Sequence, residues 1–154
     1  MYARELMLWL HARLAEPDAF ERTQKRFESL RGYGLLPRGR ENAGVRLTDK
    51  QIGSAVLGFA HSLPGYAGHA SRILGDLRPV GGESASFRGA PTLLDALAVL
   101  VKLEGAFSDL KRLTLSIERD FHADEYSAQL HFCVDGQSRV VSFVSKYASS
   151  LMHP

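Results

Sequence analysis

The spacing of hydrophobic residues changes along the chain, and this change is the strongest constraint on its fold. In the last third, apolar and polar residues alternate, as Leu113, Leu115 and Ile117 do with their polar neighbours. Such alternation is typical of β-strands with one buried face. Three runs show it: 111–119 (KRLTLSIER), 127–134 (SAQLHFCV) and 138–146 (SRVVSFVSK). Asp135-Gly136 separates the last two and is a strong hairpin signal, so a three-stranded antiparallel sheet is expected.

The residues before these runs have helical spacing. The apolar stretch 92–104 predicts a helix that packs on the sheet. Four earlier helices are expected over about 3–16, 19–31, 49–61 and 65–77. Pro17 would end the first, Asp18 would cap the second and Thr48 would cap the third.

The expected fold class is therefore α+β. Residues 1–80 would form a helical, winged helix-turn-helix-like unit. Residues 90–150 would form a helix packed on the three-stranded antiparallel sheet, as a unit for dimerisation or protein contact. The connection over 78–91 is rich in glycine and proline, as linkers are.

Composition excludes several classes of protein. The chain has 154 residues, of which 45% are hydrophobic and 23% charged, as in ordinary globular proteins. It has no run of 18 apolar residues, and charges interrupt the N-terminus too often for a signal peptide. Its one cysteine, Cys133, excludes an internal disulfide and a cysteine-based zinc site. We expect a cytoplasmic protein with no membrane segment, no metal and no cofactor.

Positive charge is concentrated in one stretch. Residues 20–50 contain eight Lys or Arg and four Asp or Glu, a net charge of +4. Residues 51–154 contain nine basic and ten acidic residues, a net charge of −1. A local excess of this kind is expected where one face meets a polyanion, although a solvated helix face and loop would also explain it.

The segment 34–48, GLLPRGRENAGVRLT, resembles the end of the recognition helix and the wing of MerR-type transcription regulators. The residues that match that pattern are Gly34, Leu35, Leu36, Pro37, Arg40, Gly44, Arg46 and Thr48. The segment is also similar to small helix-turn-helix proteins of phages and mobile elements. The resemblance covers about a tenth of the chain and implies a helix in a DNA groove beside a flexible basic wing. In that wing, residues 45–47 would form a short strand. The aromatic pair of the family's recognition helix is missing, and no long dimerising helix follows.

These features predict a DNA-binding surface. Arg22, Lys25, Arg26, Ser29 and Arg31 would lie on or near the helix that faces the groove. In the helix expected over 19–31, the apolar side is defined by Phe20, Phe27 and Leu30. The opposite, exposed side would carry Arg22, Lys25, Arg26 and Ser29 on a common stripe. Arg38, Arg40, Arg46 and Lys50 would add contacts from the loop and the next helix, mainly to phosphates. Asn42 would either reach a base edge or form the turn. A homodimer is expected because one small module contacts few base pairs.

The predicted function is sequence-specific binding of double-stranded DNA by a transcriptional regulator of a bacterial, phage or mobile-element system. The alternative is a phage-type inhibitor or adaptor that binds an acidic protein surface through the basic loop. An enzyme is not expected, because the chain contains neither a phosphate-binding glycine loop nor a nucleophile elbow. The acidic segment 120–125, DFHADE, is interpreted as a solvated loop between strands.

Overall fold

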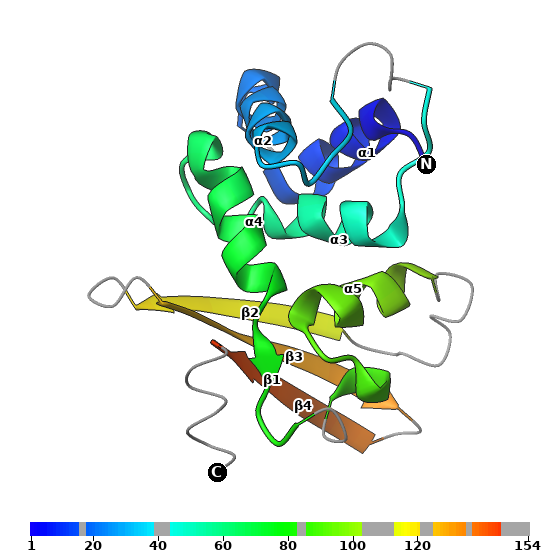
Figure 1. Cartoon of the computed structure of the whole chain (residues 1–154), viewed down its shortest axis with the longest axis vertical. Coiled ribbons are helices and arrows are strands. Elements are labelled where there is room, and N and C mark those ends of the chain that lie inside the picture. The colour runs from blue at the N-terminus through cyan, green and yellow to red at the C-terminus, as the bar shows by residue number, and fades with distance from the viewer. Residues whose placement is uncertain are drawn as a thin grey trace. The chain divides into compact units, whose positions relative to one another are not determined.

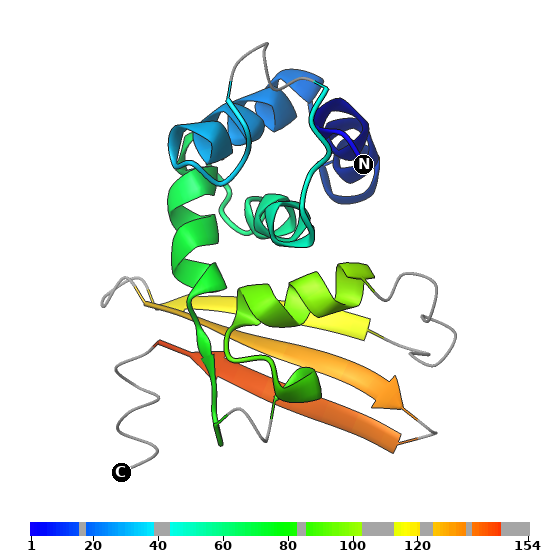
Figure 2. The same ribbon diagram turned by 45° about the vertical axis from the view of Figure 1, so that its right-hand side comes forward.

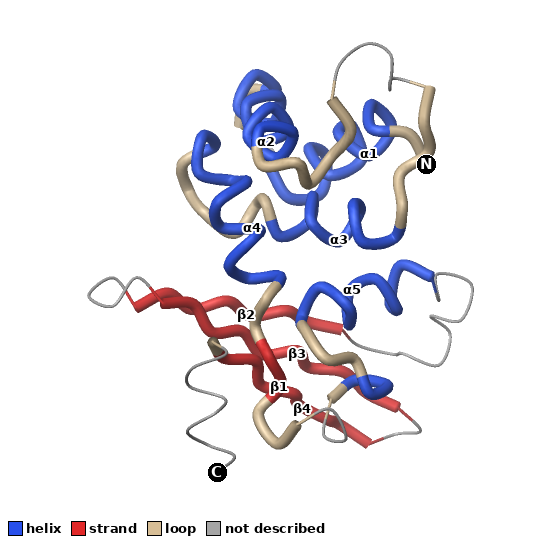
Figure 3. The backbone as a smooth tube through the Cα atoms, viewed as in Figure 1, coloured by secondary structure: helices blue, strands red, loops and turns tan. Residues whose placement is uncertain are grey.

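The computed structural model describes residues 1–15, 18–38, 44–82, 86–102, 113–120, 125–134 and 137–145. The chain divides into two compact units, Met1–Ile73 and Leu74–Pro154, and each is described by itself. Helices and an antiparallel sheet are both present, so the prediction of an α+β chain is confirmed. Figure 3 shows the two kinds of structure along the backbone.

The N-terminal unit is helical, and all four helices expected there are confirmed (Figure 1). They are α1 (Ala3–Leu10) with its π-helical continuation η1 (His11–Ala15), α2 (Phe20–Gly32), α3 (Asp49–Leu57), and α4 (Ala67–Gly75) after the 3-10 turn η3 (Pro64–Tyr66). The third helix ends at Leu57 rather than near residue 61. The boundary between the two units falls within α4.

The core of this unit forms where α1, α2 and α3 meet. Phe27 and Leu30, expected on the apolar side of α2, are both fully buried, and Leu10 of α1 is buried with them. Two residues of the connection after α2, Leu36 and Leu47, complete this cluster. Burying one such side chain contributes about 1.5–3 kcal/mol, so the cluster holds the connection as well as the helices in place.

The two predicted helix caps have different outcomes. Thr48 caps α3 as expected: its hydroxyl accepts from the amide of Gln51, whose side chain accepts from the amide of Thr48. This reciprocal capping box satisfies two amides that the helix leaves unpaired. The prediction for Asp18 is wrong, because Ala19 is the N-cap residue of α2 and makes no side-chain cap bond. Asp18 instead forms an ion pair with Arg22, one turn into α2, at 3.4 Å.

The π-helical turn η1 brings a histidine over α2. Nδ1 of His11 lies 2.7 Å from the hydroxyl of Thr23, a side chain that is fully buried. The His11 ring also meets the ring of Phe20 edge to face, with centroids 5.2 Å apart. The turn therefore gives the buried hydroxyl of α2 a hydrogen-bond partner, which a buried polar group needs.

The C-terminal unit has the three predicted strands and one that the sequence did not predict. They are β1 (Arg78–Pro79), β2 (Leu113–Asp120), β3 (Glu125–Val134) and β4 (Gln137–Val144), in the antiparallel order β1-β4-β3-β2. Figures 1 and 2 show α5 (Leu93–Lys102), the predicted covering helix, along one face of this sheet. β1 contains only two residues, one of them a proline, so it gives no alternating pattern.

The register of β3 and β4 agrees with the predicted alternation. Ala128 lies opposite Phe143, and Leu130 lies opposite Val141. All four side chains are buried, whereas residues 137–140 of β4 are exposed. The hydrophobic spacing therefore predicted which face of the sheet is buried, since side chains alternate between the two faces of a strand.

The predicted strand of a wing is wrong. Residues 45–47 form a bend and irregular backbone after a turn at Gly44, with no strand. The amide of Leu47 donates to the carbonyl of Met1 at 2.9 Å, and its side chain joins the helical core. Core packing thus replaces strand pairing at this position. The preceding loop residues 39–43 lie outside the described residues.

Within the part of the chain that the structure describes, no helix combines the length and the apolar character needed to span a lipid bilayer.

The close approach of α4 to α2 yields a test of the N-terminal unit. A Cβ atom on Gly68 would lie 2.5 Å from the carbonyl oxygen of Ser29 and 2.5 Å from a ring carbon of Tyr33, so Gly68→Ala forces the helices apart. We expect it to lower the free energy of unfolding by about 1–3 kcal/mol. Trp9, the single tryptophan, reports unfolding of this unit by fluorescence in urea. Gly65→Ala is the matched control, because a Cβ there meets no atom within 4 Å. Equal stability of the two variants would contradict this packing.

Candidate functional site

The predicted DNA-contact residues lie on α2, on the connection that follows it and at the start of α3. Arg40 and Asn42 are outside the described residues. Six of the other eight are bound inside the unit, line a groove or lie around the end of α2, and Arg46 and Lys50 belong to none of these three groups. The sequence predicts that Arg22, Lys25, Arg26 and Ser29 share one exposed stripe of α2. In the structure, Arg26 and Ser29 bind backbone groups within the unit, whereas Arg22 and Lys25 line a groove.

Arg26 is not exposed as predicted: only 6% of its surface is accessible. Its Nη1 donates to the carbonyls of Gly58 at 3.0 Å and His61 at 2.6 Å. Its Nη2 lies 3.4 Å from the carbonyl of Ser62, and the guanidinium lies 5.2 Å from the centroid of the Phe59 ring. Arg26 therefore holds the backbone that follows α3, and we exclude it from the candidate DNA contacts.

Arg26 contacts the C-terminal end of α3 and the backbone after it. Of its three acceptors, Gly58 is the C-cap residue of α3, whereas His61 and Ser62 lie in the segment between α3 and η3. A planar guanidinium with several N–H donors can bind these carbonyls together. Burial lowers the pKa of the Arg26 guanidinium, the charge of Arg22 lowers it further, and Asp18 opposes the shift. An arginine pKa starts far above neutrality, so the group stays charged in the folded protein.

Ser29 is half-buried and is also bound within the unit. Its hydroxyl donates to the carbonyl of Gly65 at 2.8 Å and accepts from the amide of Gly68 at 2.9 Å. One hydroxyl thus joins α2 to the turn η3 and to the first turn of α4. The prediction that Ser29 is available on an exposed stripe is wrong, because both of its bonds hold helices together.

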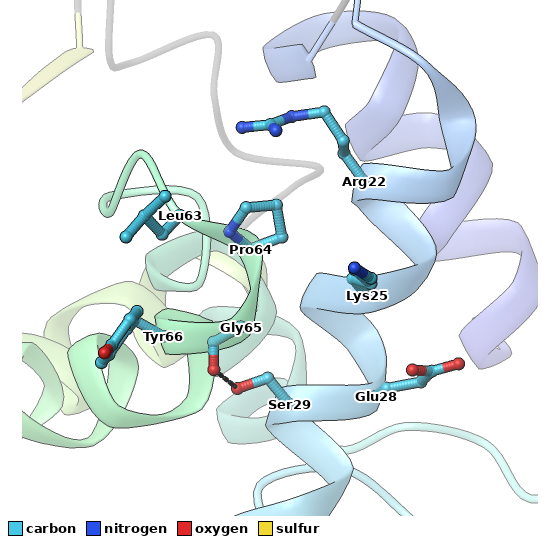
Figure 4. A pocket seen from close by; sticks show the side chains of 8 residues that line it. All are labelled: Arg22, Lys25, Glu28, Ser29, Leu63, Pro64, Gly65 and Tyr66. Carbon is cyan, nitrogen blue, oxygen red and sulfur yellow. Dashed lines mark hydrogen bonds between the residues drawn. The ribbon is translucent and has the colours of Figure 1, made fainter.

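A groove lies between α2 and the turn η3, with a volume of about 680 Å³ (Figure 4). Arg22 and Lys25 line its α2 side, and Arg22 donates to the carbonyl of Ser62 at 2.9 Å. Leu63 and Tyr66 line the other side and are both largely exposed. We call this surface the α2 groove; its complete lining is Arg22, Lys25, Glu28, Ser29, Leu63, Pro64, Gly65 and Tyr66.

Arginines gather at the C-terminal end of α2. Arg38 donates through Nε to the carbonyl of Arg31 at 2.8 Å and through Nη2 to that of Gly32 at 2.7 Å. Arg72, from α4, donates to the carbonyl of Tyr33 at 2.7 Å, and its guanidinium lies 5.3 Å from the Tyr33 ring. We call Arg31, Tyr33, Arg38 and Arg72 the α2-end cluster.

The α2-end cluster combines predicted residues with one that sequence reasoning missed. Arg31 and Arg38 were expected near DNA, whereas Arg72 stands 39 residues beyond Tyr33 and belongs to no basic stretch. Only its contact with the end of α2 shows that it belongs here. Side chains of Arg38, Arg72 and Tyr33 are exposed, so the cluster presents cations and an aromatic ring on the surface.

The two remaining predicted residues lie apart from this cluster in the sequence. Arg46 is exposed, and its guanidinium lies 5.8 Å from the centroid of the Tyr2 ring. Lys50 is exposed in the first turn of α3.

Among the residues whose positions the structure gives, no three His, Cys, Asp or Glu side chains come together in a way that would hold a metal ion.

Replacing Arg26 tests its role inside the unit. Arg26→Ala would leave the carbonyls of Gly58 and His61 without their charged donor and should lower the free energy of unfolding by roughly 3 kcal/mol. Lys25→Ala, the matched control, removes an exposed charge one residue away and should change stability by no more than about 0.5 kcal/mol. Urea titration followed by Trp9 fluorescence measures both. If the two variants are equally stable, Arg26 does not hold the segment after α3.

Comparison of the chain with models of known protein families, with curated proteins and with solved structures finds no match. The resemblance of residues 34–48 to MerR-type regulators therefore stays a prediction, and function is inferred from the charge and geometry of this chain.

Proposed function

We propose that this chain binds double-stranded DNA and that its N-terminal unit makes the contact. The observation that carries the proposal is the distribution of charge between the two units. Residues 1–73 contain eleven Lys or Arg and seven Asp or Glu, a net charge of +4. Residues 74–154 contain eight basic and ten acidic residues, a net charge of −2. DNA attracts such a positive unit through its phosphates, largely independently of sequence.

The α2-end cluster is the best-formed phosphate-binding surface of that unit. Arg38 and Arg72 are exposed, and each is anchored to a backbone carbonyl of α2 or the residue after it. Guanidinium groups match phosphate oxygens in geometry and charge. The basic connection 39–50 begins directly after this cluster, and it supplies Arg40, Arg46 and Lys50 as further cations.

We do not propose that α2 itself reads base edges. Arg26 and Ser29 are bound within the unit, and the exposed side of α2 contains two acids, Glu21 and Glu28, together with Arg22 and Lys25. Carboxylates facing phosphates would oppose entry of this helix into the major groove. These contacts favour binding to the DNA backbone, with Arg40 among the phosphate contacts, and leave Asn42 as the candidate for a base contact.

The salt dependence of DNA affinity tests this proposal. Removing two loop cations with Arg40→Ala and Arg46→Ala should weaken binding to cognate and random duplexes alike. It should also flatten the plot of log affinity against log salt by roughly 0.9 for each lost phosphate contact. Fluorescence anisotropy with a labelled duplex at several salt concentrations measures both quantities.

The matched control removes two exposed cations from the other unit, with Lys102→Ala and Arg139→Ala. It should leave the slope unchanged. Equal slopes for the two double variants would contradict contact through the N-terminal unit. Absence of duplex binding at low salt would contradict DNA binding altogether and would favour the inhibitor or adaptor that binds an acidic protein.

A further inference from the structure

The α2 groove is a second surface of the N-terminal unit, distinct from the α2-end cluster. Figure 4 shows the guanidinium of Arg22 extending toward Leu63 and Pro64, while the carboxylate of Glu28 points away from them. One wall of the groove is therefore cationic. The other wall is apolar, since Leu63 is 53% exposed and Tyr66 is 54% exposed. Large apolar side chains left this accessible beside cations are a feature of interaction surfaces.

The cations of the groove differ in how they are held. Arg22 is fixed by the carbonyl of Ser62 and is partly neutralised by Asp18, 3.4 Å from its Nε. Within the described part of the chain, Lys25 makes neither a hydrogen bond nor an ion pair. Lys25 is thus the charge that a ligand would meet without first breaking a contact.

These two walls define the chemistry of an occupant. It should carry carboxylates to face Arg22 and Lys25, and one aromatic or aliphatic side chain to cover Leu63 and Tyr66. In the C-terminal unit the densest acidic stretch has this composition: residues 120–125, DFHADE, contain three acids, one phenylalanine and no lysine or arginine. In the register of β2 and β3, Asp120 is paired with Glu125. Residues 121–124 lie outside the described part of the chain.

We propose that the α2 groove binds the acidic 120–125 segment of a second copy of this chain. The opposite net charges of the two units, +4 and −2, favour this pairing over contact between like units. In a symmetric dimer each groove receives the segment of the other copy, so the same contact forms twice. The proposal does not depend on DNA binding, and it assigns Lys25 to the dimer rather than to the duplex.

Charge reversal on each side of the contact tests the proposal. Light scattering after size exclusion should show the full chain as a dimer of 17.0 kDa subunits at micromolar concentration, with dissociation at high salt. Lys25→Glu alone and Asp124→Lys alone should each raise the dimer dissociation constant by about tenfold or more. An equimolar mixture of the two single variants should restore the dimer, because each contact then joins opposite charges again. A merely structural effect of either substitution would not be reversed by mixing.

Lys50→Glu is the matched control, because it reverses an exposed charge outside the groove and should leave the dimer intact. A monomeric unmodified chain at low salt would overturn the proposal, and so would failure of the mixture to restore the dimer. The affinity of Lys25→Glu for a labelled duplex tests whether the groove binds DNA instead of a second copy. If this variant remains a dimer but loses DNA affinity, the groove belongs to the DNA surface and the proposal fails.

Discussion

The guanidinium of Arg26 lies inside the N-terminal unit and donates to the backbone that follows α3. That backbone connects two helical elements, because α3 ends at Leu57 and the next helical turn begins at Pro64. A charge held by carbonyl groups alone is costly to bury, so the contact is stable only while those carbonyls converge on it. The position of residues 58–62, and with it one wall of the α2 groove, therefore depends on a side chain of α2.

The elements of the fold could be predicted from hydrophobic spacing because the pattern acts locally. Alternation over a few residues predicted the three long strands, and the capping residue Thr48 predicted the start of α3. Prediction failed where the deciding partner is distant. Residues 45–47 have the composition of a strand, but Leu47 packs into the helical core instead. Arg78 and Pro79 become strand β1 only because β4 lies beside them.

The candidate site was less predictable, since the same basic residue type performs two tasks here. Arg26 and Lys25 are adjacent in the sequence and equally basic, yet one is buried and the other lines a groove. The partners of Arg26 stand 32 to 36 residues later, and no local pattern indicates them. Helical spacing predicted the apolar side of α2 correctly through Phe27 and Leu30, but it placed Arg26 and Ser29 on the exposed side. The hydrogen bond between Ser29 and Gly68 of α4 was not predicted for the same reason.

The bonds at the end of α2 have a consequence for binding that concerns entropy. A free arginine side chain has about 2 kcal/mol of rotamer entropy, part of which is lost when a ligand immobilises it. Arg38 and Arg72 have already lost much of that freedom, since carbonyl groups of α2 and Tyr33 hold their guanidinium groups in the unbound protein. An anion that meets these two groups would gain their charge at a smaller conformational cost than one that meets freely rotating side chains.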